Sequence, residues 1–231
     1  MRAAVNAPAW DIDPGYLDAD ELIREEQRTR DLLARIDCIN DTAEAAVQRW
    51  HGRGHALAQR LRILTSEAVL RGWAHGPVAA APRAPLAWPE QWLESPAVQF
   101  ARLPDGGRVA RPRGPQMLWR QHKYSVLARE PAMYKAIGRR VAVPPVDQAV
   151  LAGELTAVLR VAPATGGMRN ALQHMWGYVA HVEPPEPATL AGWSLWQLLL
   201  GVRDRAMRAD CAYLLDSTAL GELGAWLPGE A

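Results

Sequence analysis

The sequence predicts an all-α, multi-helix globular protein with two helical modules. Apolar residues recur at three- and four-residue intervals over most of the 231 residues, and this spacing places them on one face of a helix. Alternation of apolar and polar residues, which is typical of strands, is scarce. About half of the residues are hydrophobic and about a fifth are charged, a balance that is ordinary for a globular protein with a buried core.

The N-terminal module, residues 1–103, is expected to contain four helices. Asp18 or Asp20 can cap the first, which runs to about Ile36 and has acidic residues in its first turn. A short helix over 42–50 and a longer one over 55–71 follow, and Gly72 ends the longer one. The stretch 77–89 is rich in proline and alanine and is expected to connect two helices. A last short helix within 88–103 is expected to pack Trp92 and Phe100.

Residues 104–115, PDGGRVARPRGP, are rich in glycine and proline and are expected to link the two modules. The C-terminal module, residues 116–231, is expected to contain helices at about 116–129, 131–141, 146–161, 167–181, 190–209 and 217–226. Two arrangements stay open at this point. The modules are either packed into one body or joined only through the linker.

Composition argues against several classes of protein. No apolar run reaches the roughly 18 residues of a membrane helix, and the N-terminus lacks the apolar region of a secretion signal. Cys38 and Cys211 lie far apart, so we expect a reducing cytoplasm rather than a disulfide framework. The histidines and cysteines lack metal-ligand spacing, and no phosphate-binding loop or dinucleotide fingerprint occurs. We expect no membrane partner, no cofactor and no metal, while the oligomeric state stays open.

Charge is unevenly distributed, although the net value is only +1. Residues 1–50 hold eleven acidic and six basic residues, whereas residues 102–142 hold ten basic residues against Asp105 and Glu130. A local surplus of eight positive charges can neutralise several phosphates. A solvated arginine-rich surface is the alternative interpretation. The only lysines of the chain, Lys123 and Lys135, lie in this basic stretch.

Two predicted helices of the basic stretch carry candidate phosphate ligands. His122 falls on the apolar stripe of the first helix, which favours a hydrogen-bonded core histidine. Lys123 lies at the edge of that stripe, where its ammonium can be exposed. Cations at the end of the second helix also suit the helix dipole. The predicted phosphate ligands are Arg111, Arg113, Arg120, Lys123, Arg139 and Arg140, with His122 and Tyr124 beside them.

The predicted helix over 167–181 has one polar face opposite a buried one. The polar face consists of Asn170, Gln173, His174 and Tyr178. These side chains supply hydrogen bonds and stacking without a fixed charge, which suits contact with a base or a ribose. A buried network between helices is the alternative. Gly166 and Gly167 precede this predicted helix, whose first N–H groups can receive an anion.

Catalytic residues cannot be assigned from a motif, and the weak candidates are Glu25, Glu26 and His174. Glu26 falls inside the apolar stripe of the first helix, and a buried carboxylate with a raised pKa can act as an acid or a base. Such a glutamate more often pairs with an arginine of another helix, and we favour that interpretation. Enzymatic use requires the glutamates and His174 to converge in one pocket.

A pattern of motifs runs through the C-terminal half, from about residue 116 to 226. It consists of His122-Lys123-Tyr124, Pro131, Tyr134, Gly138-Arg139, Val141-Ala142, Asn170, Leu172-Gln173-His174, Gly177-Tyr178 and Tyr213-Leu214-Leu215. With this pattern the half-chain resembles the YbgA-like domain of unknown function. That domain also occurs fused to a sulfur-removing domain that acts on thiolated uracil or thiouridine. The resemblance therefore implies an accessory role in binding RNA or a nucleotide.

A second set of motifs lies between about residues 10 and 73. It consists of Trp10-Asp11-Ile12, Pro14-Gly15-Tyr16-Leu17, Arg49-Trp50, Glu67 and Arg71-Gly72-Trp73. With it the N-terminal part resembles the pyrimidine-dimer DNA glycosylases of the endonuclease V type.

The N-terminal part departs from that family at the residues that carry its chemistry. The catalytic glutamate of the family aligns with Arg28, the arginine before it with Gln27, and a histidine-proline element with Glu44-Ala45. The family attacks with an N-terminal amine close to the first motif, whereas here extra residues precede that motif. The resemblance implies a glycosylase-like scaffold that is degenerate.

The leading hypothesis is a cytoplasmic nucleic-acid-binding protein. It would bind RNA such as tRNA, or damaged DNA, as an accessory to nucleic-acid modification or repair. One alternative is a divergent DNA glycosylase, lyase or nucleotide-modifying enzyme. The other is a structural or partner-binding helical protein. In that case the polar face over 170–178 would be buried against another helix, and the arginines would scatter instead of forming a patch.

Overall fold

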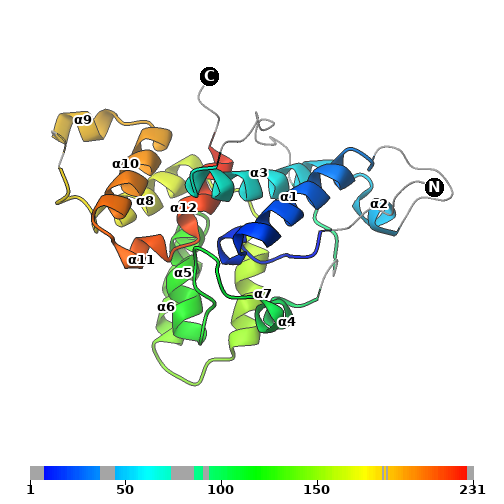
Figure 1. Ribbon diagram of the computed structural model, residues 1–231. Helices are drawn as coiled ribbons and strands as arrows, with labels where there is room; N and C mark the ends of the chain where they lie inside the picture. The colour runs from blue at the N-terminus through cyan, green and yellow to red at the C-terminus, as the bar shows by residue number, and fades with distance from the viewer. Residues whose placement is uncertain are drawn as a thin grey trace.

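The computed structural model describes residues 8–36, 45–73, 86–90, 94–183, 185 and 187–227. All regular secondary structure in these ranges is helical, which confirms the predicted all-α class (Figure 1). None of the helices within them is long and apolar enough to cross a membrane. Cys38, Trp92 and residues 77–85 of the predicted connection lie outside the described residues.

The first elements are η1 (Pro14–Tyr16), α1 (Ala19–Leu33), α2 (Ala45–Trp50), α3 (Gly54–Leu70) and α4 (Pro96–Arg102). Asp18, one of the two predicted caps, accepts a hydrogen bond from the N–H of Glu21 at 2.7 Å. Gly72 adopts φ of +82°, the left-handed conformation expected after the end of a helix. The predicted helix within 88–103 begins only at Pro96. Proline disfavours helical geometry in the preceding residue, Ser95, and suits the first helical position.

The C-terminal elements are α5 (Pro115–Leu127), α6 (Pro131–Val141), α7 (Gln148–Leu159), α8 (Thr165–Trp176), α9 (Pro187–Gly192), α10 (Leu195–Arg208), α11 (Ala212–Leu215), α12 (Ala219–Glu222) and η2 (Leu223–Trp226). The single helix predicted over 190–209 is wrong, because a new helix starts after Ser194. Ser194 and Gln197 form a reciprocal capping box, with hydrogen bonds of 2.8 and 3.1 Å. This pairing separates α10 from α9.

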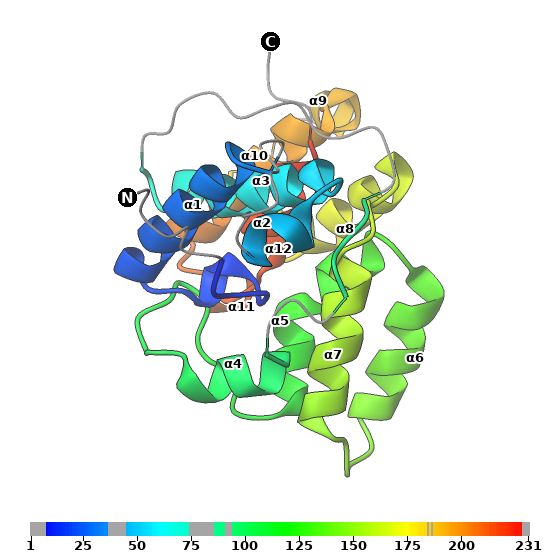
Figure 2. The ribbon, with the colours of Figure 1, turned by 90° about the vertical axis from the view of Figure 1, so that its right-hand side faces the viewer.

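The helices form two connected groups. α5, α6 and α7 lie side by side, whereas α3 packs against α1 and against the end of the chain at α12 and η2 (Figures 1 and 2). Residues from both sides of the predicted linker share one core. Trp10, Tyr16 and Leu64 belong to the same buried cluster as Leu118 and Val126.

The segment over 104–114 packs against the N-terminal half. The N–H of Val109 donates to the carbonyl of Gly15 at 2.8 Å. Gly107 comes so close to Tyr16 that a Cβ there would lie 2.3 Å from the carbonyl oxygen. Arg108 forms an ion pair with Glu67 of α3 at 2.8 Å. This segment therefore holds the surrounding helices together, and the division into two modules at this place stays a prediction.

Gly167 sits in the first turn of α8 and packs directly on the end of α5. A Cβ added to it would lie 2.0 Å from the carbonyl oxygen of Ala128. The prediction that Gly166 and Gly167 precede the helix is wrong, because α8 begins at Thr165. The close backbone approach explains a glycine at position 167.

Gly167→Ala is expected to lower the free energy of unfolding by about 1–3 kcal/mol, because α8 must shift away from α5. Gly166→Ala is the matched control, since a Cβ at Gly166 meets nothing within 4 Å. The control is expected to be neutral or slightly stabilising, because alanine favours the helix. Urea denaturation of both variants measures the difference. Equal stability of the two would contradict the packing argument.

Candidate nucleic-acid interface

The basic stretch of the chain forms a hairpin of two antiparallel helices, α5 and α6. Each begins with a proline, Pro115 and Pro131, at the position where the missing N–H costs no hydrogen bond. Residues 128–130 connect the helices. Leu118 of α5 and Ile137 of α6 point into the shared core. The hairpin is thus anchored on one face and leaves charged residues on the other.

A groove of about 560 Å³ lies on this hairpin, and we call it the α5–α6 groove. It is lined by Trp119, Lys123, Tyr134, Lys135, Gly138, Arg139 and Ala142. Its three cations have no ion-pair partner within the described part of the chain, and no carboxylate lines it. The rings of Trp119 and Tyr134 lie 5.4 Å apart. The groove therefore combines free positive charge with aromatic surface.

Lys123 also borders a cluster of three tyrosines, Tyr124, Tyr178 and Tyr213, which we call the tyrosine cluster. Its ammonium lies 4.8 Å from the ring centre of Tyr124 and 4.9 Å from that of Tyr213, within the range of cation–π attraction. Tyr178 stacks on Tyr213 with ring centres 4.6 Å apart and an interplanar angle of 24°. Burial, reinforced by hydrogen bonds with the other two tyrosines, raises the pKa of Tyr124 far above its usual value. The Tyr124 hydroxyl therefore stays protonated.

The polar face predicted over 170–178 is present and faces solvent. Gln173 and His174 are exposed and Tyr178 is 46% exposed, whereas Leu172 and Met175 on the opposite side are fully buried. If the protein had a purely structural role, we expected this polar face to pack against another helix. The face is instead exposed and open to a ligand. Asn170, the fourth predicted member, is half-buried.

Only two of the six predicted phosphate ligands, Lys123 and Arg139, line the groove. Arg120 forms an ion pair with Asp216, and Arg140 forms one with Glu154. The charges of these two arginines are therefore largely neutralised within the protein.

The two remaining arginines belong to another surface. Arg111 and Arg113 line a separate cavity of about 240 Å³ along residues 104–113. Arg111 also donates to the carbonyl of Leu103 at 3.3 Å. The predicted phosphate ligands therefore do not form one continuous patch.

His122 lies inside the protein, at the contact between α5, η1 and the start of α12. Its Nε2 is 3.0 Å from the hydroxyl of Tyr16, and its Nδ1 is 3.1 Å from the hydroxyl of Thr218. Burial lowers the pKa of His122 to about 3, so the ring is neutral near pH 7. Tyr124 is also buried. We therefore leave both out of the interface, because neither side chain reaches the surface.

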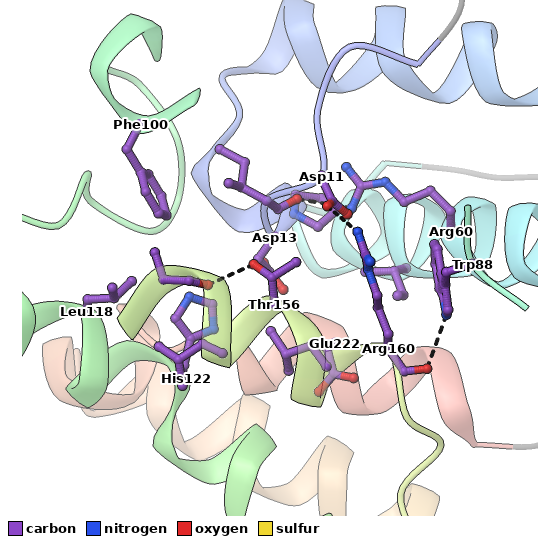
Figure 3. Close-up of a pocket in the computed structure, with 16 residues that line it drawn as sticks. Asp11, Asp13, Arg60, Trp88, Phe100, Leu118, His122, Thr156, Arg160 and Glu222 are labelled. Atoms are coloured by element: carbon purple, nitrogen blue, oxygen red, sulfur yellow. Dashed lines mark hydrogen bonds and ion pairs between the residues drawn. The ribbon is translucent and has the colours of Figure 1, made fainter. Parts of the chain in front are cut away.

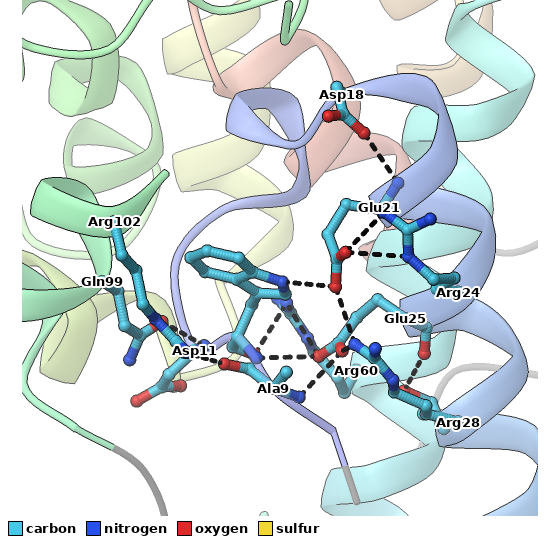
Figure 4. Close-up of polar contacts among 12 residues, drawn as sticks. Ala9, Asp11, Asp18, Glu21, Arg24, Glu25, Arg28, Arg60, Gln99 and Arg102 are labelled. Carbon is cyan, nitrogen blue, oxygen red and sulfur yellow. Dashed lines mark hydrogen bonds and ion pairs between the residues drawn. The ribbon is translucent and has the colours of Figure 1, made fainter. Parts of the chain in front are cut away.

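Glu25 is fully buried and holds the N-terminal segment in place. Its carboxylate accepts hydrogen bonds from the backbone N–H groups of Ala9 and Trp10, at 2.8 and 3.1 Å (Figure 4). Arg28 lies 3.4 Å away, and Arg60 of α3 lies 3.9 Å away. Burial nevertheless raises the pKa of Glu25. The nitrogens that donate to Glu25 are peptide nitrogens, and they cannot act as an amine nucleophile because the lone pair of each is delocalised into a carbonyl group. The contact between Glu25 and the N-terminal segment is therefore structural.

The weak catalytic candidates do not converge in one pocket. Glu26 accepts hydrogen bonds from Arg30 and from Thr65 of α3. α1, which carries both glutamates, packs against α3, whereas α8 packs against α5 and α10. The two ribbon views show α1 and α8 well apart (Figures 1 and 2). His174 therefore has no carboxylate partner from α1.

A smaller cavity of about 50 Å³ lies where residues 11–14 meet α5 and α7 (Figure 3). Its polar lining includes Asp13, Arg60 and His122, and its aromatic walls are Trp88 and Phe100. Burial, reinforced by the negative charge of nearby Glu67, raises the pKa of Asp13 to about 7. No sequence motif singled out Asp13. Asp13 caps η1 by accepting a hydrogen bond from the N–H of Gly15 at 2.8 Å. An aspartate at the start of a helix is ordinary, so it does not indicate a catalytic residue.

Comparison with protein families matches residues 9–79 to the family described as pyrimidine dimer DNA glycosylase. The matched stretch contains η1, α1, α2 and α3, and it supplies Asp13 and Arg60 to the smaller cavity. No curated protein matches the chain, and no solved structure matches it. The YbgA-like character of the C-terminal half stays a prediction. Over less than half of its length, the chain is thus similar to a family of DNA repair glycosylases.

Proposed function

We propose that the protein binds nucleic acid through the α5–α6 groove and the adjoining polar face of α8, as an accessory to nucleic-acid modification or repair. The groove carries the proposal, because it gathers two aromatic rings and three cations that have no ion-pair partner among the described residues, and no carboxylate lines it. The similarity of residues 9–79 to pyrimidine dimer DNA glycosylases supports repair as the setting. The YbgA-like resemblance supports RNA, such as tRNA, as the other candidate ligand.

Electrostatics distinguish the groove cations from the other arginines. A cation that contacts a phosphodiester releases condensed counterions, and this release drives binding. Arg120 and Arg140 must first break their own ion pairs with Asp216 and Glu154. The three groove cations carry no such cost. Three phosphate contacts correspond to a slope of about −2 to −3 in the logarithm of the binding constant against the logarithm of the salt concentration.

Lys123→Ala is expected to make this salt slope shallower by about 0.7–0.9 and to weaken binding several-fold at low salt, because one phosphate contact is lost. Fluorescence anisotropy with tRNA, single-stranded DNA and duplex DNA across a salt series measures both quantities. The preference among the three nucleic acids identifies the ligand class.

Arg24→Ala is the control for net charge. It also removes one positive charge, but from an exposed side chain of α1 outside the groove. Its salt slope is expected to match that of the unmodified protein. An affinity that is independent of salt, or equal losses in the two variants, would exclude the groove as the binding site.

A divergent DNA glycosylase or lyase is the second candidate function, and one observation favours it. Asp13 belongs to the stretch that matches the glycosylase family, lines the smaller cavity and has a pKa raised to about 7. A carboxyl with a pKa near the working pH is suited to proton transfer. Incubation with dimer-containing and abasic duplexes tests this activity. Cleavage that is abolished by Asp13→Asn would support the glycosylase or lyase function. Substrates that stay intact would exclude it.

A further inference from the structure

The tyrosine cluster adds a stacking surface next to the charged groove. Tyr178 is 46% exposed, and its ring lies nearly parallel to that of Tyr213, which backs it on one side. Tyr124 meets Tyr213 edge-to-face, with ring centres 6.5 Å apart. These contacts fix the orientation of Tyr178 while leaving part of its ring open. An aromatic ring held in this way is a preformed platform for another flat ring.

We propose that this platform receives an unpaired base, so that the α5–α6 groove binds single-stranded nucleic acid. This inference rests on the proposed function, because it names the class of ligand for the same groove. Stacking of bases on aromatic side chains is typical of proteins that bind single strands, since every base has a π-face. In a duplex the neighbouring base pairs cover those faces.

Lys123 connects the two parts of the site. Its side chain lines the groove together with Lys135 and Arg139, and its ammonium also lies against the ring of Tyr213. A strand that places a phosphate on Lys123 therefore brings an adjacent base towards the Tyr178–Tyr213 stack. His174, four residues before Tyr178, is also exposed.

The test compares strands that share phosphates but differ in bases. Fluorescence anisotropy at low salt measures binding of single-stranded DNA, single-stranded RNA, a duplex and an abasic strand of the same length. The single strands are expected to bind about tenfold more tightly than the duplex and the abasic strand. Whether DNA or RNA is preferred distinguishes the two sources of the strand.

Variants separate stacking from charge. Tyr178→Ala is expected to weaken binding of the base-containing strands about tenfold and to leave the abasic strand unchanged. Tyr178→Phe keeps the ring and is expected to bind almost as the unmodified protein does. Lys135→Ala should weaken every strand equally, because it removes charge alone.

The two proposals fail in different ways. A duplex that binds as tightly as the single strands, or a Tyr178→Ala variant that loses the abasic strand equally, would overturn the inference while leaving the proposed function in place. Absence of salt-dependent binding to all four nucleic acids would overturn both.

Discussion

Glu67→Gln is expected to lower the free energy of unfolding by about 3–5 kcal/mol, because it breaks a buried ion pair on one side only. Glu67 is 1% exposed, and its carboxylate pairs with Arg71 at 2.9 Å and with Arg108 at 2.8 Å. Glutamine keeps the shape of the side chain and removes its charge. Two poorly hydrated guanidinium groups then lose their anion. Arg108 also donates to the carbonyl of Leu215, so the loss loosens contacts between distant parts of the chain.

Urea denaturation near pH 7 measures this loss as a shift of the unfolding midpoint. Glu94→Gln is the matched control, because Glu94 pairs with Arg102 on the surface, where the side chains are 54% and 44% exposed. An exposed pair contributes at most about 1 kcal/mol. If both variants were destabilised to the same extent, the buried position of Glu67 would have no special importance.

Most helices could be predicted from the sequence, because the signals that start and end them act on neighbouring backbone groups. Asp18 caps α1 through an N–H three residues away, and Pro131 starts α6 through its own ring. The errors occurred where local signals compete. Ser194 lies within a continuous apolar period, and only its reciprocal pairing with Gln197 interrupts the helix there.

The α5–α6 groove could be predicted only in part, because its charge depends on partners that are distant in the sequence. Lys123 and Arg139 come together through a hairpin whose two helices can both be predicted from the sequence. Arg120, by contrast, is neutralised by Asp216, which lies 96 positions further along the chain. No local sequence pattern predicts this ion pair.

The burial of Asp13 and Glu67 could not be predicted from the sequence for a related reason. An amphipathic pattern assigns charged residues to the surface, and Asp13 and Glu67 violate that rule. Glu67 is retained inside because Arg71 and Arg108 supply its counter-charge, and Arg108 lies 41 positions away. Burial raises the pKa of Asp13, and the negative charge of Glu67 raises it further, although the hydrogen bond from the N–H of Gly15 acts in the opposite direction. Both facts follow from tertiary packing.

The stability of the protein is expected to depend on pH in opposite directions through two buried groups, Asp13 and His122. The pKa of Asp13 is about 7 in the folded protein and 3.8 in a solvated side chain. Between these values the folded state keeps a proton that the unfolded state has released. The free energy of unfolding therefore falls as the pH rises through this window, by about 4 kcal/mol in total.

His122 acts in the other direction. Its pKa is about 3 when folded and 6.5 when solvated, so the unfolded state takes up a proton that the folded state excludes. The free energy of unfolding therefore falls as the pH drops from about 6.5 to 3. Between pH 3.8 and 6.5 the two slopes have opposite signs and largely cancel. Above pH 6.5 only Asp13 contributes a slope, and below pH 3.8 only His122 does.

Asp13→Asn isolates the contribution of Asp13, because asparagine resembles the protonated acid and still caps η1. The variant is expected to be more stable than the unmodified protein at pH 8 by up to about 4 kcal/mol and similar to it at pH 4. Urea denaturation at a series of pH values measures the difference. Asp105→Asn, at a position 88% exposed, is the control and should show no such trend. A difference between Asp13→Asn and the unmodified protein that stays constant from pH 4 to 8 would mean that Asp13 is ionised in the folded state. The smaller cavity would then hold a fixed negative charge, and the acid–base role that favours the second candidate function would lose its physical basis.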